Sequence, residues 1–330
     1  MNRKVSVAPM MDCTDKHERY FLRLISKNVL LYTEMIVSEA IERGDKKKLL
    51  SFNLEEKPVA LQIGGSSPKL LSSAAKTGEE FGYDEINLNL GCPSKKVQKN
   101  KFGACLIKEP NLVADCLSEM QVKTKLPVTV KTRIGYDQIE DYEHLYNFIS
   151  LLKSTGVKTF IMHARKAMLG KFTPKQNLNI PPLKYEMVYK LKEDFKDLEI
   201  IINGGITSSD QIKNHLKKTD GVMIGRSIYH SPYMLADIEK EIFNNEDTPS
   251  RQEVIEKLVQ YLKNEVKKGT RVNQIMRHTL GLFHGQTGSN FWKRYLSENM
   301  CVRDADIKKV DHIMDKVKLN RVTQTTVQVD

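Results

Sequence analysis

The sequence contains little cysteine and no long apolar segment. Its 330 residues include five cysteines and no Cys-x-x-Cys pair, which argues against a disulfide framework and against a zinc site. No run reaches 18 uninterrupted apolar residues, and the first ten residues lack the charged start and apolar stretch of a secretion signal. We therefore expect a cytoplasmic protein with free thiols, no metal and no membrane contact.

Acidic residues are outnumbered by basic ones. Lys and Arg total 52 against 41 Asp and Glu, which gives a formal net charge of +11. From residue 251 onward the counts are 15 and 9, so +6 of this charge falls on the last 80 residues. The excess favours a polyanionic partner, although a merely soluble basic protein would have the same balance.

Short apolar or β-branched runs alternate with amphipathic helical stretches through the first 225 residues. The runs that predict strands are 5–8, 30–33, 59–63, 85–89, 128–131, 159–163, 200–203 and 221–224. The intervening segments that predict helices include 16–26, 68–81, 112–124, 142–154, 182–192 and 208–216. This alternation indicates an α/β fold of parallel strands joined by helices. Eight units predict a closed (β/α)8 TIM barrel, because an open doubly wound sheet would carry an early glycine-rich nucleotide fingerprint.

After Tyr229 the pattern changes to helices without strands. The predicted helices are 233–243, 251–268, 271–280, 291–299 and 304–319. The polar segment 244–250 ends in a Pro-Ser pair that is typical of a helix start, so we interpret it as a linker. The predicted division is a catalytic barrel over 1–243, the linker over 244–250 and an all-helical domain over 251–330.

Barrel enzymes carry their chemistry at the carboxyl ends of the strands. Polar or small residues follow all eight predicted strands, and each has an ordinary structural explanation when taken alone. Their coincidence at one rim favours a functional site. The rim residues are Pro9, Met10, Met11, Glu34, Gln62, Asn87, Cys92, Lys131, Arg133, His163, Arg165, Asn203, Gly204, Gly205, Gly225 and Arg226.

The ends of the last two strands predict a phosphate site. Gly204-Gly205 allows close approach of the backbone, and Gly225-Arg226 adds a second close approach beside a cation. A cofactor phosphate held there would leave its ring over the barrel mouth, where Lys131 could stabilise negative charge. FMN is the expected cofactor. Pyridoxal phosphate on a Schiff base with Lys131 is the alternative.

The strand-end segments form a set that includes 8–12, 32–35, 87–94, 102–106, 130–133, 163–167, 202–206 and 225–226. This set resembles the tRNA-dihydrouridine synthases, and the resemblance runs through the barrel into the tail. Segments 20–23, 174–177, 180–183 and 277–285 resemble the A-type bacterial branch in particular.

The resemblance implies an FMN enzyme that reduces the C5–C6 double bond of uridines 20 and 20a in the tRNA D-loop, with NADPH as reductant. In that family the reduced flavin gives a hydride to C6, and a cysteine that matches Cys92 gives a proton to C5. An ordinary thiol keeps its proton at neutral pH, so this role requires no thiolate. Cys105, on the same loop, is the alternative donor.

The resemblance also implies contact residues. The flavin contacts carry over to Pro9, Met10, Met11, Gln62, Lys131, His163, Asn203, Gly204, Gly205, Gly225 and Arg226. The tRNA contacts carry over to Asn89, Lys175, Gln176 and Arg294, with Arg165 and Lys166 near the target nucleotide. Leu178 departs from the branch, where a basic residue is expected. We expect a monomer with tRNA as its partner.

The basic helical domain suits RNA, because a stacked uracil must be splayed out and its backbone held. The segment 291–295 interleaves aromatic and basic residues, as stacking and phosphate contact require, although Trp292 also fits a buried helix face. Lys46 to Lys48 are expected in a solvated loop. Two other functions stay open: an FMN barrel that reduces a free pyrimidine, like dihydroorotate dehydrogenases, and a non-catalytic RNA-binding protein on the same fold.

Overall fold

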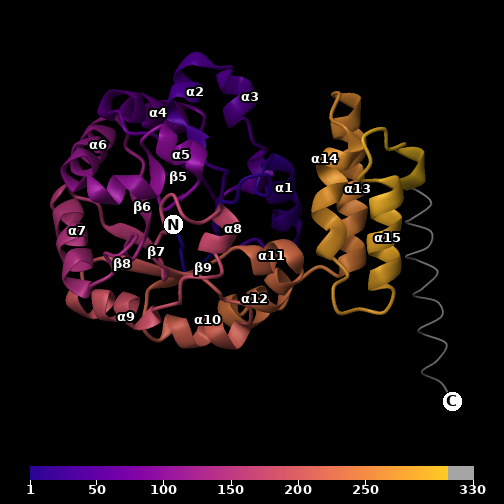
Figure 1. Ribbon diagram of the computed structural model, residues 1–330. Helices are drawn as coiled ribbons and strands as arrows, with labels where there is room; N and C mark the ends of the chain where they lie inside the picture. The colour runs from indigo at the N-terminus through magenta and orange to yellow at the C-terminus, as the bar shows by residue number, and fades with distance from the viewer. Residues whose placement is uncertain (311–330) are drawn as a thin grey trace. The chain divides into compact units, whose positions relative to one another are not determined.

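The computed structural model describes residues 1–310, which fall into two compact units (Figure 1). The first unit comprises Met1–Lys16 with Val29–Gly225, and the second comprises His17–Asn28 with the chain from Arg226 onward. The division at 244–250, which was drawn from composition, stays a prediction.

Eight parallel strands of the first unit form a closed barrel. Their order around the sheet is β1, β9, β8, β7, β6, β5, β4 and β2. Their bounds are β1 (Val5–Val7), β2 (Leu31–Tyr32), β4 (Val59–Gly64), β5 (Glu85–Leu90), β6 (Val128–Arg133), β7 (Thr159–His163), β8 (Glu199–Asn203) and β9 (Gly221–Ile224). The barrel closes where the Val7 N–H donates to the Leu30 carbonyl at 2.9 Å and the Leu30 N–H donates to the Val5 carbonyl at 3.2 Å. The TIM barrel and its eight predicted strands are confirmed.

A further strand, β3 (Ile36–Val37), pairs with β4 off the barrel path. It was not predicted from the sequence.

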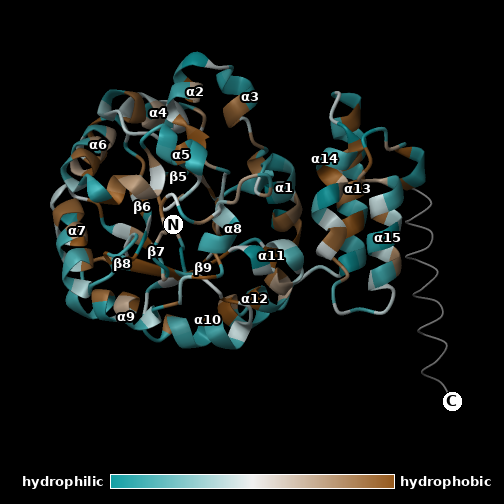
Figure 2. Ribbon diagram, viewed as in Figure 1, coloured by the Kyte–Doolittle hydropathy of each residue, from teal (hydrophilic) through white to brown (hydrophobic). Residues whose placement is uncertain are grey.

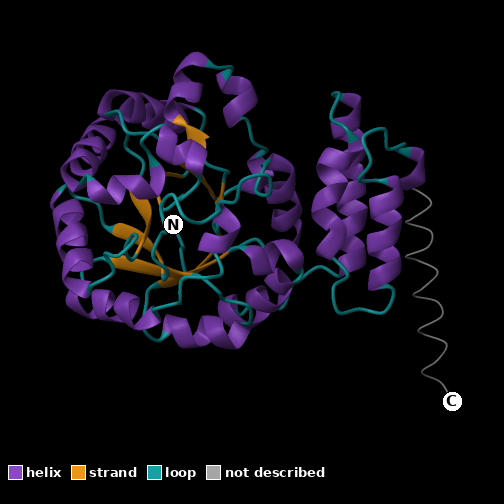
Figure 3. Ribbon diagram, in the orientation of Figure 1, coloured by secondary structure: helices purple, strands orange, loops and turns teal. Residues whose placement is uncertain are grey.

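Helices surround the strands of this unit (Figure 3). They are α2 (Ser38–Arg43), α3 (Lys46–Leu50), α4 (Pro68–Glu80), α5 (Lys95–Lys99), α6 (Pro110–Lys123), α7 (Tyr142–Ser154), α8 (Pro174–Asn177), α9 (Tyr185–Asp194) and α10 (Ser209–Leu216), with 3-10 turns η1 (Leu54–Glu56) and η2 (Gly103–Lys108). Side chains of Ser67, Asp141 and Ser208 accept backbone N–H groups at the starts of α4, α7 and α10.

The prediction of a loop at Lys46 to Lys48 was wrong, because these residues form the first turn of α3. The Asp45 side chain caps this helix by accepting the Lys48 N–H at 3.0 Å, a local bond that the lysine run itself does not reveal.

The described residues of the second unit form helices joined by loops, with no strand among them. It contains α1 (Lys16–Ile25), α11 (Arg226–His230), α12 (Met234–Phe243), α13 (Arg251–Lys267), α14 (Val272–Met276), η3 (Arg277–Gly281) and α15 (Ser289–Asn299). The predicted helix 271–280 is interrupted, because its second half tightens into the 3-10 turn η3. The predicted helix 304–319 falls mostly outside the described residues.

Trp292 lies in the core of the second unit. Its side chain is 2% exposed, donates to the Thr279 carbonyl at 2.8 Å and packs on Phe283 with 4.8 Å between ring centroids. The expectation of core packing is therefore confirmed. Arg294, two residues further along α15, is exposed. Within residues 1–310, every helix is too short or too polar to cross a membrane.

An apolar cluster lies in the barrel interior. This buried cluster comprises Ala8, Leu30, Tyr32, Ala60, Ile161, Ile201 and Met223, and Figure 2 shows brown strands inside mainly teal outer helix surfaces. Alternate residues of a strand share a face, so residues two further along point inward near the carboxyl end. On β7 and β8 those residues are His163 and Asn203, which pair in register.

A buried ion pair lies near the amino ends of the strands. The Arg3 guanidinium contacts Glu85 at 2.7 Å and Glu199 at 2.9 Å, and the Glu85 side chain is fully buried. Without Arg3 the Glu85 carboxylate would be a buried charge with no cation beside it, so the pair constrains the base of the barrel.

We expect Arg3→Met to lower the free energy of unfolding by about 3 kcal/mol, because it leaves the Glu85 carboxylate buried and unpaired. Lys57→Met is the matched control, since the Lys57–Asp84 pair is solvent-accessible, with side chains 39% and 28% exposed, and should cost less than about 1 kcal/mol. Urea unfolding measures both. Equal losses in the two variants would contradict the burial argument.

Candidate active site at the carboxyl ends of the strands

The first unit brings most of the predicted site residues to the carboxyl end of its barrel. Gln62 lies in β4, Asn89 in β5, Lys131 in β6 and His163 in β7. Asn203, Gly204 and Gly205 end and follow β8, and Gly225 follows β9. Arg226 and Arg294 belong to the second unit, in α11 and α15.

Cys92 lies on a turn that three hydrogen bonds hold. The N–H groups of Gly91 and Cys92 both donate to Asn89 Oδ1 at 3.0 Å, and the Cys92 carbonyl accepts the Ala104 N–H at 3.0 Å. Gly103 has φ of +73°, and a Cβ added there would lie 2.7 Å from the Cys92 carbonyl oxygen. The half-buried thiol is therefore presented on a stiff turn, and the Asn89 side chain is used to hold it.

Lys131 is a cation without a carboxylate partner. Its ammonium donates to Asn203 Oδ1 at 3.1 Å, and the described residues supply it with no ion pair. Burial, together with the neighbouring positive charge of Arg133, lowers the pKa of Lys131 to about 7. Cys92 is close enough to oppose this shift electrostatically. The site therefore has a polar group ready to donate to an anion or a carbonyl.

Gly204 and Gly205 form a cradle that side chains would fill. Their φ angles are +124° and +70°. A Cβ on Gly204 would meet the His163 ring at 2.8 Å, and a Cβ on Gly205 would meet Leu183 at 2.6 Å. Glycine is required at both positions, because protein atoms take the place of a side chain and the backbone there is left-handed. The cradle, the Lys131 ammonium and the amide of Gln62 fit the phosphate and the polar ring edge of a flavin.

Hydrogen bonds within the turn after β1 pair some of its backbone groups. The Met10 N–H donates to Thr14 Oγ1 at 3.0 Å, and the Met10 carbonyl accepts the N–H groups of Cys13 at 3.1 Å and Thr14 at 3.0 Å. The backbone of Pro9 to Met11 was predicted to contact the flavin. The N–H and the carbonyl of Met10 thus already have protein partners. The Met11 side chain is 55% exposed.

Arg133 was predicted at the rim but was not assigned to the flavin or to the tRNA. It is 2% exposed and donates to three carbonyls: Gly91 at 2.9 Å, Lys166 at 3.0 Å and Asn177 at 3.2 Å. Burial, with a further contribution from Arg165, lowers its pKa to about 10. Alternation along β6 places Arg133 on the same face as Lys131, in agreement with its predicted position at the rim.

Asn177 organises the loop between β7 and α9, which carries α8. This buried side chain accepts the Met168 N–H at 2.7 Å and donates to the carbonyls of Met168, Phe172 and Thr173 at 3.1–3.3 Å. Gln176 Oε1 accepts the Thr173 N–H at 2.9 Å in a capping box, so part of this predicted tRNA contact serves α8 itself. Lys175 is exposed beside it.

The other predicted RNA contacts in this loop also have protein partners. Lys166 pairs with Glu140 at 3.0 Å, and Lys184 pairs with the same carboxylate at 3.1 Å. Burial opposes ionisation of Glu140, but bonds from the two lysines outweigh it and lower the pKa of this carboxyl. Arg165 donates to the Pro181 carbonyl. Leu178, the departure from the A-type pattern, is half-buried at the end of α8.

Cys105 differs from Cys92 in its surroundings. Its thiol donates to the Phe102 carbonyl at 3.0 Å, and burial raises its pKa. Its proton is therefore engaged within the loop.

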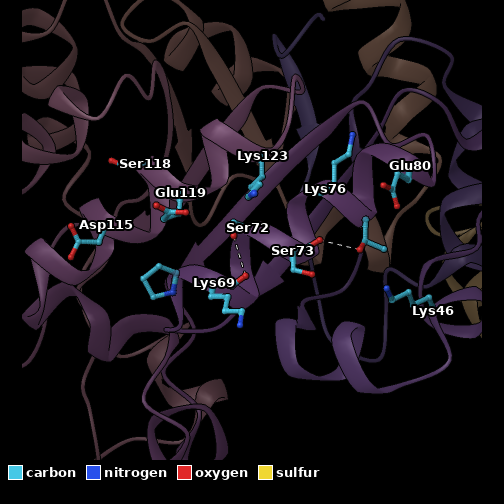
Figure 4. A pocket seen from close by; sticks show the side chains of 12 residues that line it. Lys46, Lys69, Ser72, Ser73, Lys76, Glu80, Asp115, Ser118, Glu119 and Lys123 are labelled. Atoms are coloured by element: carbon cyan, nitrogen blue, oxygen red, sulfur yellow. Dashed lines mark hydrogen bonds between the residues drawn. The ribbon is translucent and has the colours of Figure 1, made fainter.

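A separate groove of about 870 Å³ lies against the outer helices α4 and α6. Its lining mixes lysines with carboxylates and hydroxyls, as Figure 4 shows for Lys69, Lys76, Asp115 and Glu119, and none of the predicted site residues lines it. In the described part of the chain, no group of three or more His, Cys, Asp or Glu side chains is placed to hold a metal ion.

A family model described as dihydrouridine synthase (Dus) matches residues 6–318. A tRNA-dihydrouridine(20/20a) synthase of Synechocystis sp. is 51% identical over 302 residues, which cover 91% of this chain and 90% of that one. Proteins of the same name from Shewanella oneidensis and Escherichia coli are 48% and 50% identical and cover 98% and 95% of this chain, and 97% and 91% of their own lengths.

Among solved structures, a 2-naphthoyl-CoA reductase complex aligns with a TM-score of 0.53 at 12% identity, over 73% of this chain and 50% of that chain. This likeness supports the barrel fold. The family match over nearly the whole chain is decisive: the chain belongs to the dihydrouridine synthase family, whose members are flavin-dependent oxidoreductases that act on uridines of tRNA.

Proposed function

We propose that this chain reduces the C5–C6 double bond of uridines 20 and 20a in the tRNA D-loop, with FMN as cofactor and NADPH as reductant. The observation that carries the proposal is that the Cys92 turn and the half-buried Lys131 ammonium meet at one rim with the Gly204-Gly205 cradle. The (20/20a) assignment is supported by the names of relatives at about half identity over most of the chain.

FMN would be held at the carboxyl ends of the strands. Gly204, Gly205, Gly225 and Arg226 would receive its phosphate, and Asn203 would orient Lys131 through their 3.1 Å hydrogen bond. Gln62, His163 and the turn Pro9, Met10 and Met11 would contact its ring. When bound and reduced, the flavin supplies the hydride that reaches C6 of uracil. Because members of the family are flavin-dependent, FMN is preferred over pyridoxal phosphate on Lys131.

Cys92 holds the second component of the reduction, the proton that goes to C5. Its Sγ–H bond breaks as the C5–H bond forms, so the thiol must be protonated when the uracil is bound. The stiff turn fixes the position of Sγ and lowers the entropic cost of this alignment. Cys105 is less suited, because its proton is engaged by the Phe102 carbonyl.

Asn89, Arg165, Lys166, Lys175, Gln176 and Arg294 are the proposed tRNA contacts. Their basic members would neutralise phosphates, which positions the RNA without reading its sequence. A polyanionic substrate of this kind also accounts for the excess of basic residues. A cytoplasmic location agrees with such a substrate, and the monomeric state stays a prediction.

We expect Cys92→Ala to bind FMN and tRNA like the unmodified protein but to form dihydrouridine at least about 100-fold more slowly, because the general acid is lost. The assay uses NADPH and tRNA free of dihydrouridine, and the modified positions are mapped by reverse transcription. Cys105→Ala is the control and should keep most of the activity. Full activity of Cys92→Ala would remove Cys92 from the mechanism, and product at positions other than 20 and 20a would overturn the site assignment.

FMN binding should take up a proton above pH 7. The apoprotein holds Lys131 with a pKa of about 7, so its amine is mostly neutral at pH 8. Hydrogen-bond acceptors of the ring favour the ammonium and raise that pKa, which requires uptake of up to about one proton at pH 8 and little at pH 6.

Calorimetric titrations in buffers of different ionisation enthalpy measure this uptake. Lys131→Met should abolish it, whereas Lys153→Met, a change at a surface lysine on α7, should not. An uptake at pH 8 that persists in Lys131→Met would assign the proton to another group.

A further inference from the structure

A continuous line of buried polar side chains runs along the barrel interior from Glu85 to Cys92. Thr129 Oγ1 donates to Glu85 at 2.6 Å, and Asn87 Nδ2 donates to Thr129 Oγ1 at 2.8 Å. Gln62 Nε2 then donates to Asn87 Oδ1 at 2.8 Å.

The line continues to the rim. Asn89 Nδ2 donates to Gln62 Oε1 at 2.8 Å, and Asn89 Oδ1 accepts the N–H of Cys92 at 3.0 Å. Glu85, Asn87 and Thr129 are fully buried, and Gln62 is 1% exposed. Water is therefore a poor substitute for any of these partners.

The two ends of this line fix the orientation of every member. An ionised Glu85 has only acceptors, so Thr129 must donate to it and accept from the amide nitrogen of Asn87. The oxygen of Asn87 must then face the nitrogen of Gln62. At the other end, the backbone N–H of Cys92 can only donate, so the oxygen of Asn89 must face Cys92 and its nitrogen must face Gln62. Both ends demand the same arrangement of the three amides.

We propose that Thr129 and Asn87 are positioning residues. Through their hydrogen bonds, the buried carboxylate of Glu85 sets the amide orientation of Gln62 and helps to fix the position of the Cys92 turn. These bonds leave Gln62 one N–H and one lone pair, whose directions are then fixed for the proposed contact with the flavin. This proposal rests on the proposed function in that Gln62 is taken as a flavin contact. Hydrogen bonds that all donate in the same direction strengthen one another, so the loss of the Thr129 hydroxyl should weaken the hydrogen bonds of Gln62 and Asn89 at the rim.

The direct test replaces Thr129. Thr129→Val keeps the shape of the side chain but removes the hydroxyl, so the nitrogen of Asn87 loses its acceptor and the three amides are held from the Cys92 end alone. We expect the affinity of the apoprotein for FMN, measured by quenching of flavin fluorescence, to fall by about tenfold. Thr129→Ser restores the hydroxyl and should bind FMN within about twofold of the unmodified protein.

Thr132→Val is the matched control. Thr132 is a fully buried threonine on the same strand, but it lies on the opposite face and makes only long contacts with the carbonyls of Leu90 at 3.5 Å and Arg133 at 3.4 Å. Its loss should leave FMN affinity unchanged. If Thr129→Val and Thr132→Val bind FMN equally well, the proposal is wrong, whatever their melting temperatures.

Two further measurements test the proposal if Thr129→Val does not fold or if the protein does not bind FMN. If Thr129→Val fails to melt cooperatively, Thr129→Cys takes its place, since a thiol is a weaker donor and acceptor of similar size and should give an intermediate loss. If the unmodified protein takes up no FMN, the proposed function fails on its own, and alkylation of Cys92 by iodoacetamide then tests the line of hydrogen bonds. Thr129→Val should speed that alkylation several-fold, and an unchanged rate would overturn the proposal.

Discussion

The in-phase alternation of eight parallel strands in a closed barrel is the constraint on which the site depends. Side chains two residues apart share a face, and the register aligns Gln62 with Asn87, Asn89 with Lys131, and His163 with Asn203. A slip of one residue on β5 would move Asn87 and Asn89 outward and turn Ile86 and Leu88 into the barrel. The same rule that buries the apolar cluster therefore assembles the polar rim.

Hydrogen bonds then decide what that rim can do. The side-chain oxygen of Asn89 accepts two backbone N–H groups and thereby holds the turn that carries Cys92. Arg133 ties the same turn to the loop of α8 through carbonyls of Gly91 and Asn177. Within residues 1–310 no carboxylate pairs with the half-buried Lys131, which is costly for a cation but leaves it available to stabilise negative charge on a ligand.

The fold was largely predictable from the sequence, because strand alternation and helix periodicity are local signals. The eight strands were located to within a residue or two at most ends, and helix α7 was predicted over its whole length. Two of the errors have local causes: α3 depends on the cap at Asp45, and η3 tightens where an α-helix was expected. Trp292 shows the opposite case, since its spacing on α15 favoured burial and the structure buries it.

The sequence by itself determined the barrel, the rim positions of Cys92 and Lys131, and the resemblance that points to flavin and tRNA, since these follow from periodicity and motif. Only the tertiary structure decided how those groups are held. The burial of Arg133 and the line from Glu85 to Cys92 both depend on contacts between separate strands and loops. A linear pattern records which residues share a face, but not which donor meets which acceptor across neighbouring strands.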